Sequence, residues 1–88
     1  MYKIEFAASA GRQMEKIYCV DRKLFSRLRA AIDSLMQDPY QGKRLKGPLK
    51  GDFSLRVGDF RIIYTVMQDK LIVYIIDLGH RKDIYKEK

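Results

Sequence analysis

The sequence predicts an α+β domain in which two helices cover one face of a β-sheet. Three observations lead to this class. Residues 2–6 alternate apolar and polar side chains, as a half-buried strand does. Residues 8–35 carry apolar side chains at helical spacing, and residues 52–78 hold three runs rich in β-branched and aromatic residues. We therefore expect the order strand, helix, helix, three-stranded antiparallel meander and short C-terminal helical tail.

Length and composition narrow the class of protein. With 88 residues, 47% of them hydrophobic and 33% charged, the chain is expected to form one globular domain over residues 1–88. A single cysteine, Cys19, excludes an internal disulfide. The N-terminus lacks the apolar stretch of a signal peptide, and the longest apolar run, residues 71–76, is too short to cross a bilayer. We expect a cytoplasmic protein that does not enter a membrane.

The two helices follow from residue spacing and a cap. The first is expected over about residues 8–18. Asp21 is a suitable N-cap for the second helix, which ends before Pro39. The buried face of the second helix is expected to consist of Leu24, Leu28, Ala31, Ile32 and Leu35. Three sulfur-containing side chains are expected in or near the core: Met14, Cys19 and Met36.

Residues 38–51 are expected to form the one extended loop, because they hold both prolines and three of the six glycines. The loop also carries four basic side chains, Lys43, Arg44, Lys46 and Lys50. The net charge of +7 attracts polyanions to the whole domain. The loop is therefore expected to contact nucleic-acid phosphates, although a solvated basic loop is the alternative.

The hairpin after this loop brings two arginines together. Strands are expected over residues 52–57, 60–67 and 71–78, and Gly58-Asp59 suits a type II′ turn. This turn places Arg56 directly opposite Arg61, on the face away from the helices. Facing like charges destabilise a sheet, whereas a bound phosphate neutralises both guanidinium groups. We expect an anion site here; the alternative is that the two side chains spread apart into water.

Regular pairing of the last two strands extends this arginine face. It places Tyr74, Ile76 and Leu78 beside the arginines and Asp77 on the helix-covered face. Ile63, Ile72 and Ile76 then form exposed aliphatic positions that suit a protein partner. His80 and Arg81 follow where the strand ends and are expected to approach the same anion. Tyr85 shares a face with Arg81 if the tail makes a helical turn.

These side chains suit cleavage of a phosphodiester by the neighbouring 2′-hydroxyl. That reaction needs a proton acceptor, cations around the phosphorane and a proton donor for the leaving oxygen. Arginine fills the second role well, because it stays charged and binds phosphate oxygens bidentately. The sequence holds one histidine, one cysteine and no close carboxylate array. We expect a metal-independent reaction without a cofactor.

Three spaced stretches resemble the RelE family of bacterial and archaeal toxins. They are Arg44-Leu45-Lys46-Gly47, the Phe53–Tyr64 stretch that includes Arg56 and Arg61, and Gly79-His80-Arg81-Lys82-Asp83-Ile84-Tyr85. The resemblance implies a ribosome-dependent endoribonuclease that cleaves mRNA in the ribosomal A site and so inhibits translation. It also implies a cognate antitoxin as partner, contact with ribosomal RNA, and a free toxin that is a monomer.

The resemblance assigns roles to individual residues. Arg61 and Arg81 match phosphate-stabilising arginines, and the resemblance implies that Arg81 also helps to protonate the leaving oxygen. Arg56 matches the second of two basic residues on the preceding strand, and Tyr85 matches a tyrosine that orients the substrate. Ser54 stands where the family has a lysine proposed as the general base. Serine is a poor base at neutral pH, so His80, Lys46 or Lys50 is expected to take that role. The expected RNA-binding residues are Lys43, Arg44, Lys46, Lys50, Ser54 and Lys82.

Two alternatives stay open. ParE toxins share the fold but act by binding DNA gyrase, without enzymatic activity, and they generally lack the arginine and tyrosine set. A catalytically weakened member that binds RNA without cutting it is the second alternative, which Ser54 favours.

Overall fold

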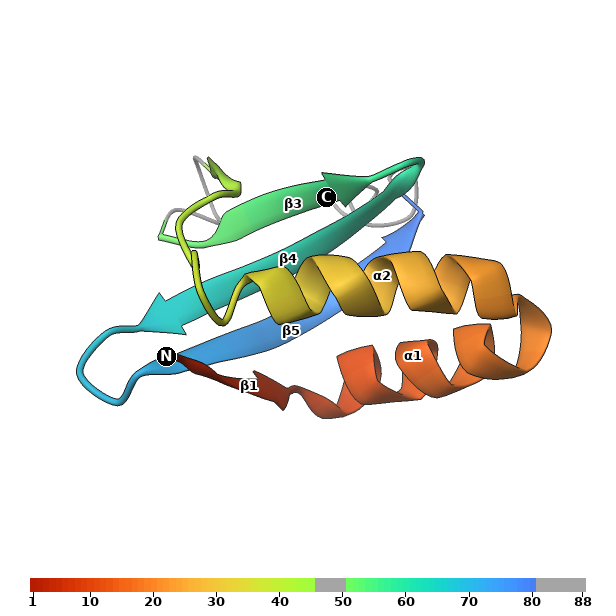
Figure 1. Ribbon diagram of the computed structural model, residues 1–88, viewed down its shortest axis with the longest axis horizontal. Coiled ribbons are helices and arrows are strands. Elements are labelled where there is room, and N and C mark those ends of the chain that lie inside the picture. The colour runs from red at the N-terminus through yellow and green to blue at the C-terminus, as the bar shows by residue number, and fades with distance from the viewer. Residues whose placement is uncertain (46–50, 81–88) are drawn as a thin grey trace.

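The computed structural model describes residues 1–45 and 51–80. It contains β1 (Lys3–Phe6), α1 (Ala8–Val20), α2 (Arg22–Ser34), β2 (Lys43–Arg44), β3 (Phe53–Val57), β4 (Phe60–Met67) and β5 (Ile72–His80) (Figure 1). The expected α+β class and the expected order of the helices and main strands are confirmed. The expected C-terminal helical tail falls on residues 81–88, which lie outside the described residues.

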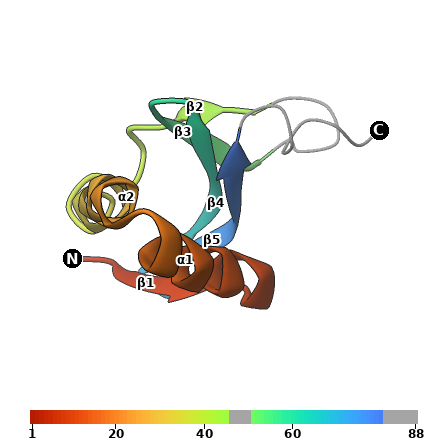
Figure 2. The same cartoon turned by 90° about the vertical axis from the view of Figure 1, so that its right-hand side faces the viewer.

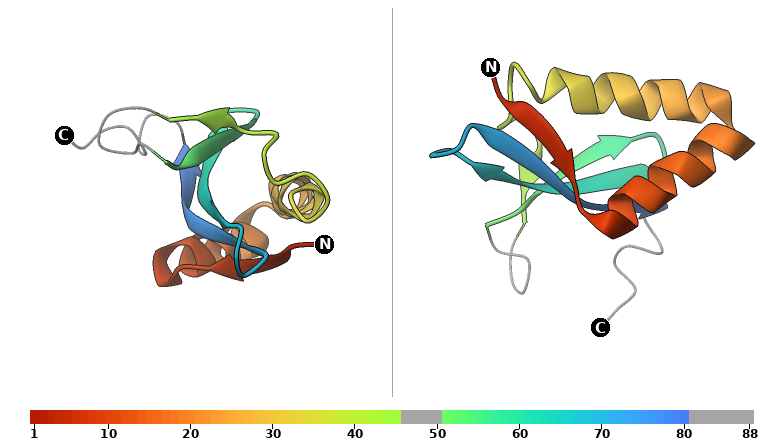
Figure 3. Two further views of the ribbon diagram at one scale, coloured as in Figure 1. Left: turned by 90° about the vertical axis from the view of Figure 1, so that its left-hand side faces the viewer. Right: turned by 90° about the horizontal axis from the view of Figure 1, so that it is seen from below.

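The sheet has five strands in the order β1-β5-β4-β3-β2. β1 pairs with β5 in parallel, and the remaining pairs are antiparallel. Both α1 and α2 lie on the same side of this curved sheet, so neither of them covers the opposite side of β3 and β4 (Figure 2). The view from below shows β1 running along the edge of the sheet before the chain turns into α1 (Figure 3).

The helices form where the sequence indicates. The Asp21 carboxylate accepts a hydrogen bond from the Leu24 N–H at 3.0 Å and so caps α2 as expected. α1 extends to Val20, two residues beyond its expected end. Its last turn is exposed, so the expectation that Cys19 lies in or near the core is wrong. Among the described residues, no helix is long and apolar enough to span a membrane.

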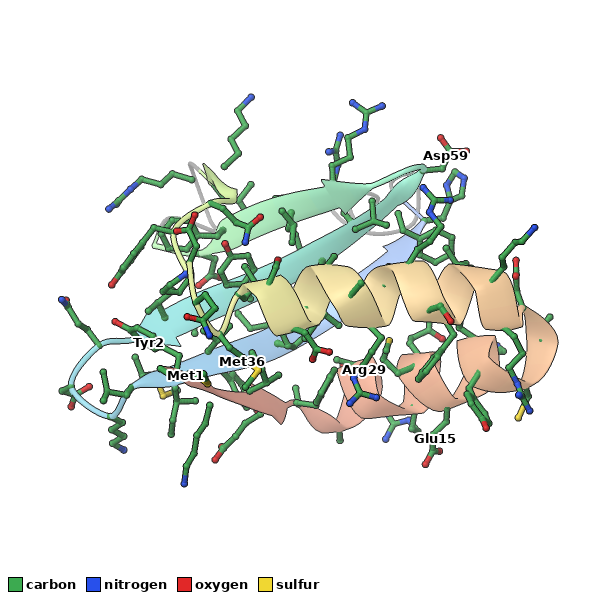
Figure 4. All side chains as sticks on the ribbon, viewed as in Figure 1. Met1, Tyr2, Glu15, Arg29, Met36 and Asp59 are labelled. Atoms are coloured by element: carbon green, nitrogen blue, oxygen red, sulfur yellow. The ribbon has the colours of Figure 1, made fainter. Side chains whose placement is uncertain are left out.

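The core lies between the helices and the sheet. Leu28, Ile32 and Leu35 of the second helical segment are buried against β-strand side chains, as expected from their spacing. Partners from the sheet are Phe53, Ile62, Tyr64, Val73, Ile75 and Leu78. Near the N-terminus, the Tyr2 N–H donates to Met36 O at 3.0 Å, which ties the start of β1 to the end of α2 (Figure 4).

The β3–β4 hairpin has the expected register. Gly58 has a φ of +60°, whereas the φ of Asp59 is not positive. A type II′ turn requires this combination. Arg56 pairs with Arg61, and Val57 pairs with Phe60. Asp59 lies at the tip of this hairpin (Figure 4). The register that places the two arginines opposite each other is therefore confirmed.

The β4–β5 pairing departs from the expected register. Tyr64 pairs with Ile75 but Ile63 pairs with Asp77, so Ile76 is an extra residue in β5, a β-bulge. Because side chains alternate between faces, the extra residue reverses the face of everything that follows it in the strand. Leu78 therefore lies in the core and Asp77 lies on the face that carries Ile63, the reverse of the expectation for both.

The segment expected as one extended loop contains a short strand. β2 is only two residues long, and it pairs antiparallel with β3 at the edge of the sheet. Lys43 pairs with Ser54, and Arg44 pairs with Phe53. The strand has no alternation of apolar and polar residues, which is why the sequence did not indicate it.

Candidate nucleic-acid interface

A hollow of about 540 Å³ lies over β2, β3 and β4, on the face opposite α1 and α2. We call it the basic hollow. Its described lining residues are Gln41, Gly42, Lys43, Leu45, Ser54, Leu55, Arg56 and Arg61. Three of these are cationic, and none is Asp or Glu. Four residues that the sequence singled out, Lys43, Ser54, Arg56 and Arg61, are therefore brought together in one concave surface of a single sign of charge.

The two arginines of the basic hollow differ in exposure. Arg56 is exposed, and its Nε donates to Gly58 O at 3.3 Å across the turn. Arg61 is half-buried, and its Nε is out of reach of solvent. Charges in a drier setting interact more strongly with a bound anion. The pair can therefore hold an anion at its rim through Arg56 and deeper in the hollow through Arg61.

Lys43 and Ser54 lie side by side on neighbouring strands. Ser54 is buried, with 7% of its surface exposed, and it lines the basic hollow. Lys43 is exposed and reaches the same hollow from the edge strand. The ammonium group beside Ser54 is thus that of Lys43, which belongs to the adjacent strand β2. Arg44 instead lies on the other face, with its guanidinium carbon 5.4 Å from the Phe53 ring centroid.

His80 does not join the arginines. It pairs with Phe60, and its ring meets the Phe60 ring edge-on with 6.0 Å between centroids. Its side chain lines a separate hollow on the helix side, together with Lys16, Asp21 and other residues of the helices. The expectation that His80 approaches the arginine pair is wrong, because the bulge at Ile76 turns residue 80 to the opposite face.

The turn that leads into β2 is held by the hydroxyl of Tyr64, a residue that the sequence analysis did not single out for the site. Tyr64 is fully buried, and its hydroxyl donates to Pro39 O at 2.8 Å and accepts from the Gly42 N–H at 3.0 Å. Burial raises the pKa of Tyr64, while the Gly42 hydrogen bond lowers it in part. The hydroxyl therefore keeps its proton at neutral pH and can make both hydrogen bonds.

Several expected site residues lie outside the described residues: Lys46, Lys50, Arg81, Lys82 and Tyr85. Within residues 1–45 and 51–80, no three His, Cys, Asp or Glu side chains gather closely enough to hold a metal ion.

Ile63, expected as an exposed aliphatic, is buried with 3% exposure, and Ile72 and Ile76 are half-buried. The expectation that these three residues form an exposed aliphatic surface is therefore wrong.

Comparison with known proteins identifies the family. Residues 4–85 match the family described as ParE toxin of type II toxin-antitoxin system, parDE. The chain belongs to the RelE/ParE superfamily of toxins. It is also 33% identical over 86 residues to toxin RelG of Mycobacterium tuberculosis, covering 97% of each chain. The resemblance that the sequence suggested is thus confirmed at the level of the superfamily.

Solved structures agree with this membership. The toxin-antitoxin complex RelBE2 of Mycobacterium tuberculosis contains a chain with a TM-score of 0.79 and 27% identity, covering 91% of this chain and 98% of that one. A YoeB/ParE toxin from Agrobacterium tumefaciens has a TM-score of 0.81 at 20% identity, with coverage of 89% and 96%, which shows a shared fold. This chain is accordingly a type II toxin with the fold of the RelE/ParE superfamily.

Proposed function

We propose that this toxin is an endoribonuclease that cleaves mRNA in the ribosomal A site and so inhibits translation. The observation that carries the proposal is the basic hollow, where Arg56 and Arg61 face each other and Lys43 joins them from β2. Folding gains nothing from three neighbouring cations, whereas an RNA phosphate accepts hydrogen bonds from all of them. The proposed partners are a cognate antitoxin, mRNA and the ribosome.

The proposed reaction uses the nucleophile that RNA itself supplies. The 2′-oxygen attacks phosphorus and loses its proton, the bond from phosphorus to the 5′-oxygen breaks, and that oxygen takes up a proton. The products are a 2′,3′-cyclic phosphate and a 5′-hydroxyl. Arg56 and Arg61 stabilise the negative charge that grows on the phosphorane oxygens. Arg81 and Tyr85 keep the roles that the family resemblance implies, as proton donor to the leaving oxygen and as substrate-orienting residue.

The proton acceptor is the unassigned role. Ser54 lines the basic hollow, but its hydroxyl is too weak a base at neutral pH, and His80 lies on the other face. Lys46 and Lys50 follow Lys43 in the basic segment and keep the candidacy that the sequence gave them. Ser54 therefore lines the proposed RNA site without serving as the base.

The test uses ribosomes paused on a defined mRNA. The purified toxin is added, and new 5′ ends are mapped by primer extension. We expect cuts within the A-site codon that fall about 10²- to 10³-fold in rate with Arg61→Gln, and that disappear with Arg81→Ala. Arg12→Gln is the matched control, because Arg12 is an exposed arginine of α1, away from the basic hollow. Equal cleavage by the Arg61→Gln and Arg12→Gln variants would refute the assignment.

A gyrase-directed toxin is the second candidate, favoured by the family description that matches the chain. A supercoiling assay with purified DNA gyrase separates the two functions. Inhibited supercoiling together with intact mRNA would overturn the ribonuclease proposal. RNA binding without cleavage by the wild type would instead identify a catalytically weakened member of the superfamily.

A further inference from the structure

We propose that the Tyr64 hydroxyl is a positioning group for the RNA site, holding Lys43 in the basic hollow. The inference rests on the proposed function, because it concerns a residue that acts through Lys43 and does not touch RNA itself. Tyr64 points into the core side of the sheet, whereas Lys43 lines the opposite face. The connection between them is the turn of residues 39–42.

β2 cannot fix Lys43 by pairing alone. The strand is two residues long and lies at the edge of the sheet, so few backbone hydrogen bonds hold it. The residues that flank β2 supply the rest. On one side, Leu45 N–H donates to Asp52 O at 2.9 Å. On the other side, the turn is held by the Tyr64 hydroxyl.

The hydroxyl joins both ends of that turn. It donates to Pro39 O at 2.8 Å and accepts from the Gly42 N–H at 3.0 Å, so the turn is closed around one buried oxygen. The Tyr64 ring cannot move away easily, because it stacks on Phe53 with 5.3 Å between centroids and 16° between planes. Gly42 immediately precedes Lys43, so a fixed Gly42 N–H also fixes the position of the Lys43 backbone and the direction of its side chain.

Gly42 is part of the same arrangement. A Cβ at residue 42 would lie 2.6 Å from the Tyr64 hydroxyl oxygen and 3.0 Å from Ser54 O. The backbone at residue 42 therefore lies close to both the Tyr64 hydroxyl oxygen and β3, the strand that pairs with β2. Gln41 adds a second fastening through its side-chain amide, which donates to Ser34 Oγ at 2.9 Å and to Asp38 O at 3.1 Å. The turn is held from β4 and from the end of α2.

The experiment measures the salt dependence of RNA binding. The probe is a fluorescein-labelled 2′-O-methyl RNA oligonucleotide, whose blocked 2′-oxygens prevent cleavage, read by fluorescence anisotropy. The slope of log K against log salt is negative, and loss of one phosphate contact reduces its magnitude by about 0.7 for a single strand. We expect this decrease for Lys43→Gln and most of it for Tyr64→Phe. The double variant should show no further decrease beyond Lys43→Gln.

The double-variant cycle separates positioning from general loosening of the fold. Additive effects of Tyr64→Phe and Lys43→Gln, or an unchanged slope in Tyr64→Phe, would overturn the proposal. Tyr18→Phe is the control, since Tyr18 is an exposed tyrosine of α1. Urea unfolding of each variant confirms that the protein measured is folded.

Gly42→Ala tests the same arrangement by a second route. Its added Cβ should displace the turn and reproduce the reduced slope of Tyr64→Phe. In a Tyr64→Phe background the closest contact is removed, so Gly42→Ala should then have a smaller effect. Equal effects in both backgrounds would contradict the proposal.

The same assay separates the positioning role from the ribonuclease proposal. If Lys43→Gln leaves the slope unchanged while Arg61→Gln reduces its magnitude, the positioning role fails and the ribonuclease proposal stands. If neither reduces it, the RNA site itself fails.

Discussion

Neutralising Arg56 should make the toxin more stable while it weakens RNA binding. Arg56 lies directly opposite Arg61, and such like-charge pairs destabilise a sheet by about 0.2–1 kcal/mol. Because Arg56 is exposed, the repulsion acts largely through water, which keeps it in the lower part of that range, at about 0.5 kcal/mol. For a domain of this size, that corresponds to an increase in Tm of about 2–4 °C for Arg56→Gln.

The assay is thermal unfolding followed by circular dichroism at low and at high salt. The stabilisation should shrink as salt rises, because the Debye length falls from about 30 Å at 0.01 M to about 3 Å at 1 M. Arg12→Gln is the matched control, with the same change of charge on an exposed helix position. In parallel, inorganic phosphate should raise the Tm of the wild type more than that of Arg56→Gln. A loss of stability in Arg56→Gln at low salt, or a gain that salt does not alter, would refute the repulsion argument.

Three further predictions concern the fold. Leu28→Ala should lower the free energy of unfolding by about 2–5 kcal/mol, because Leu28 is fully buried; urea denaturation measures it, and a loss under 1 kcal/mol would contradict the packing described. Asp21→Ala should cost about 0.5–2 kcal/mol through the lost cap of α2, and Asp21→Asn should recover most of it in the same assay. Burial raises the pKa of Tyr64, so the folded state retains this proton where the unfolded chain loses it, near pH 10; the free energy of unfolding should therefore fall as pH rises above about 10, and fall less steeply in Tyr64→Phe. Parallel pH profiles for the two proteins would argue against that assignment.

Local patterns in the sequence predict much of the fold. The Asp21 cap, the helical spacing from Leu24 to Leu35 and the Gly58-Asp59 turn each act over a few residues, and each is confirmed. The Arg56–Arg61 pairing follows from the turn alone, because a two-residue hairpin fixes its own register. These features could be predicted because nothing distant decides them.

The features that sequence reasoning missed depend on distant partners. The bulge at Ile76 is invisible in a run of apolar residues, yet it decides the faces of Asp77, Leu78 and His80. Similarly, the Tyr64 hydroxyl finds its partners 22 and 25 residues away along the chain. Gly42, which stands next to the basic residues Lys43 and Arg44, is the sequence feature that could have indicated this turn. The hydrogen-bond partners themselves follow only from the folded chain.

The parallel pairing of β1 with β5 bears on how the toxin is made. Lys3 pairs with Ile72, so β1 is synthesised well before β5, its partner in the sheet. Pairings between such distant residues are slow to form, because closing the intervening chain costs entropy before any contact repays it. The helices and the β3–β4 hairpin can form locally during synthesis, but the complete sheet has to wait for β5. The sheet should thus be the last part of the domain to assemble, and a pulse-labelled hydrogen-exchange experiment should find the β1 amides protected last.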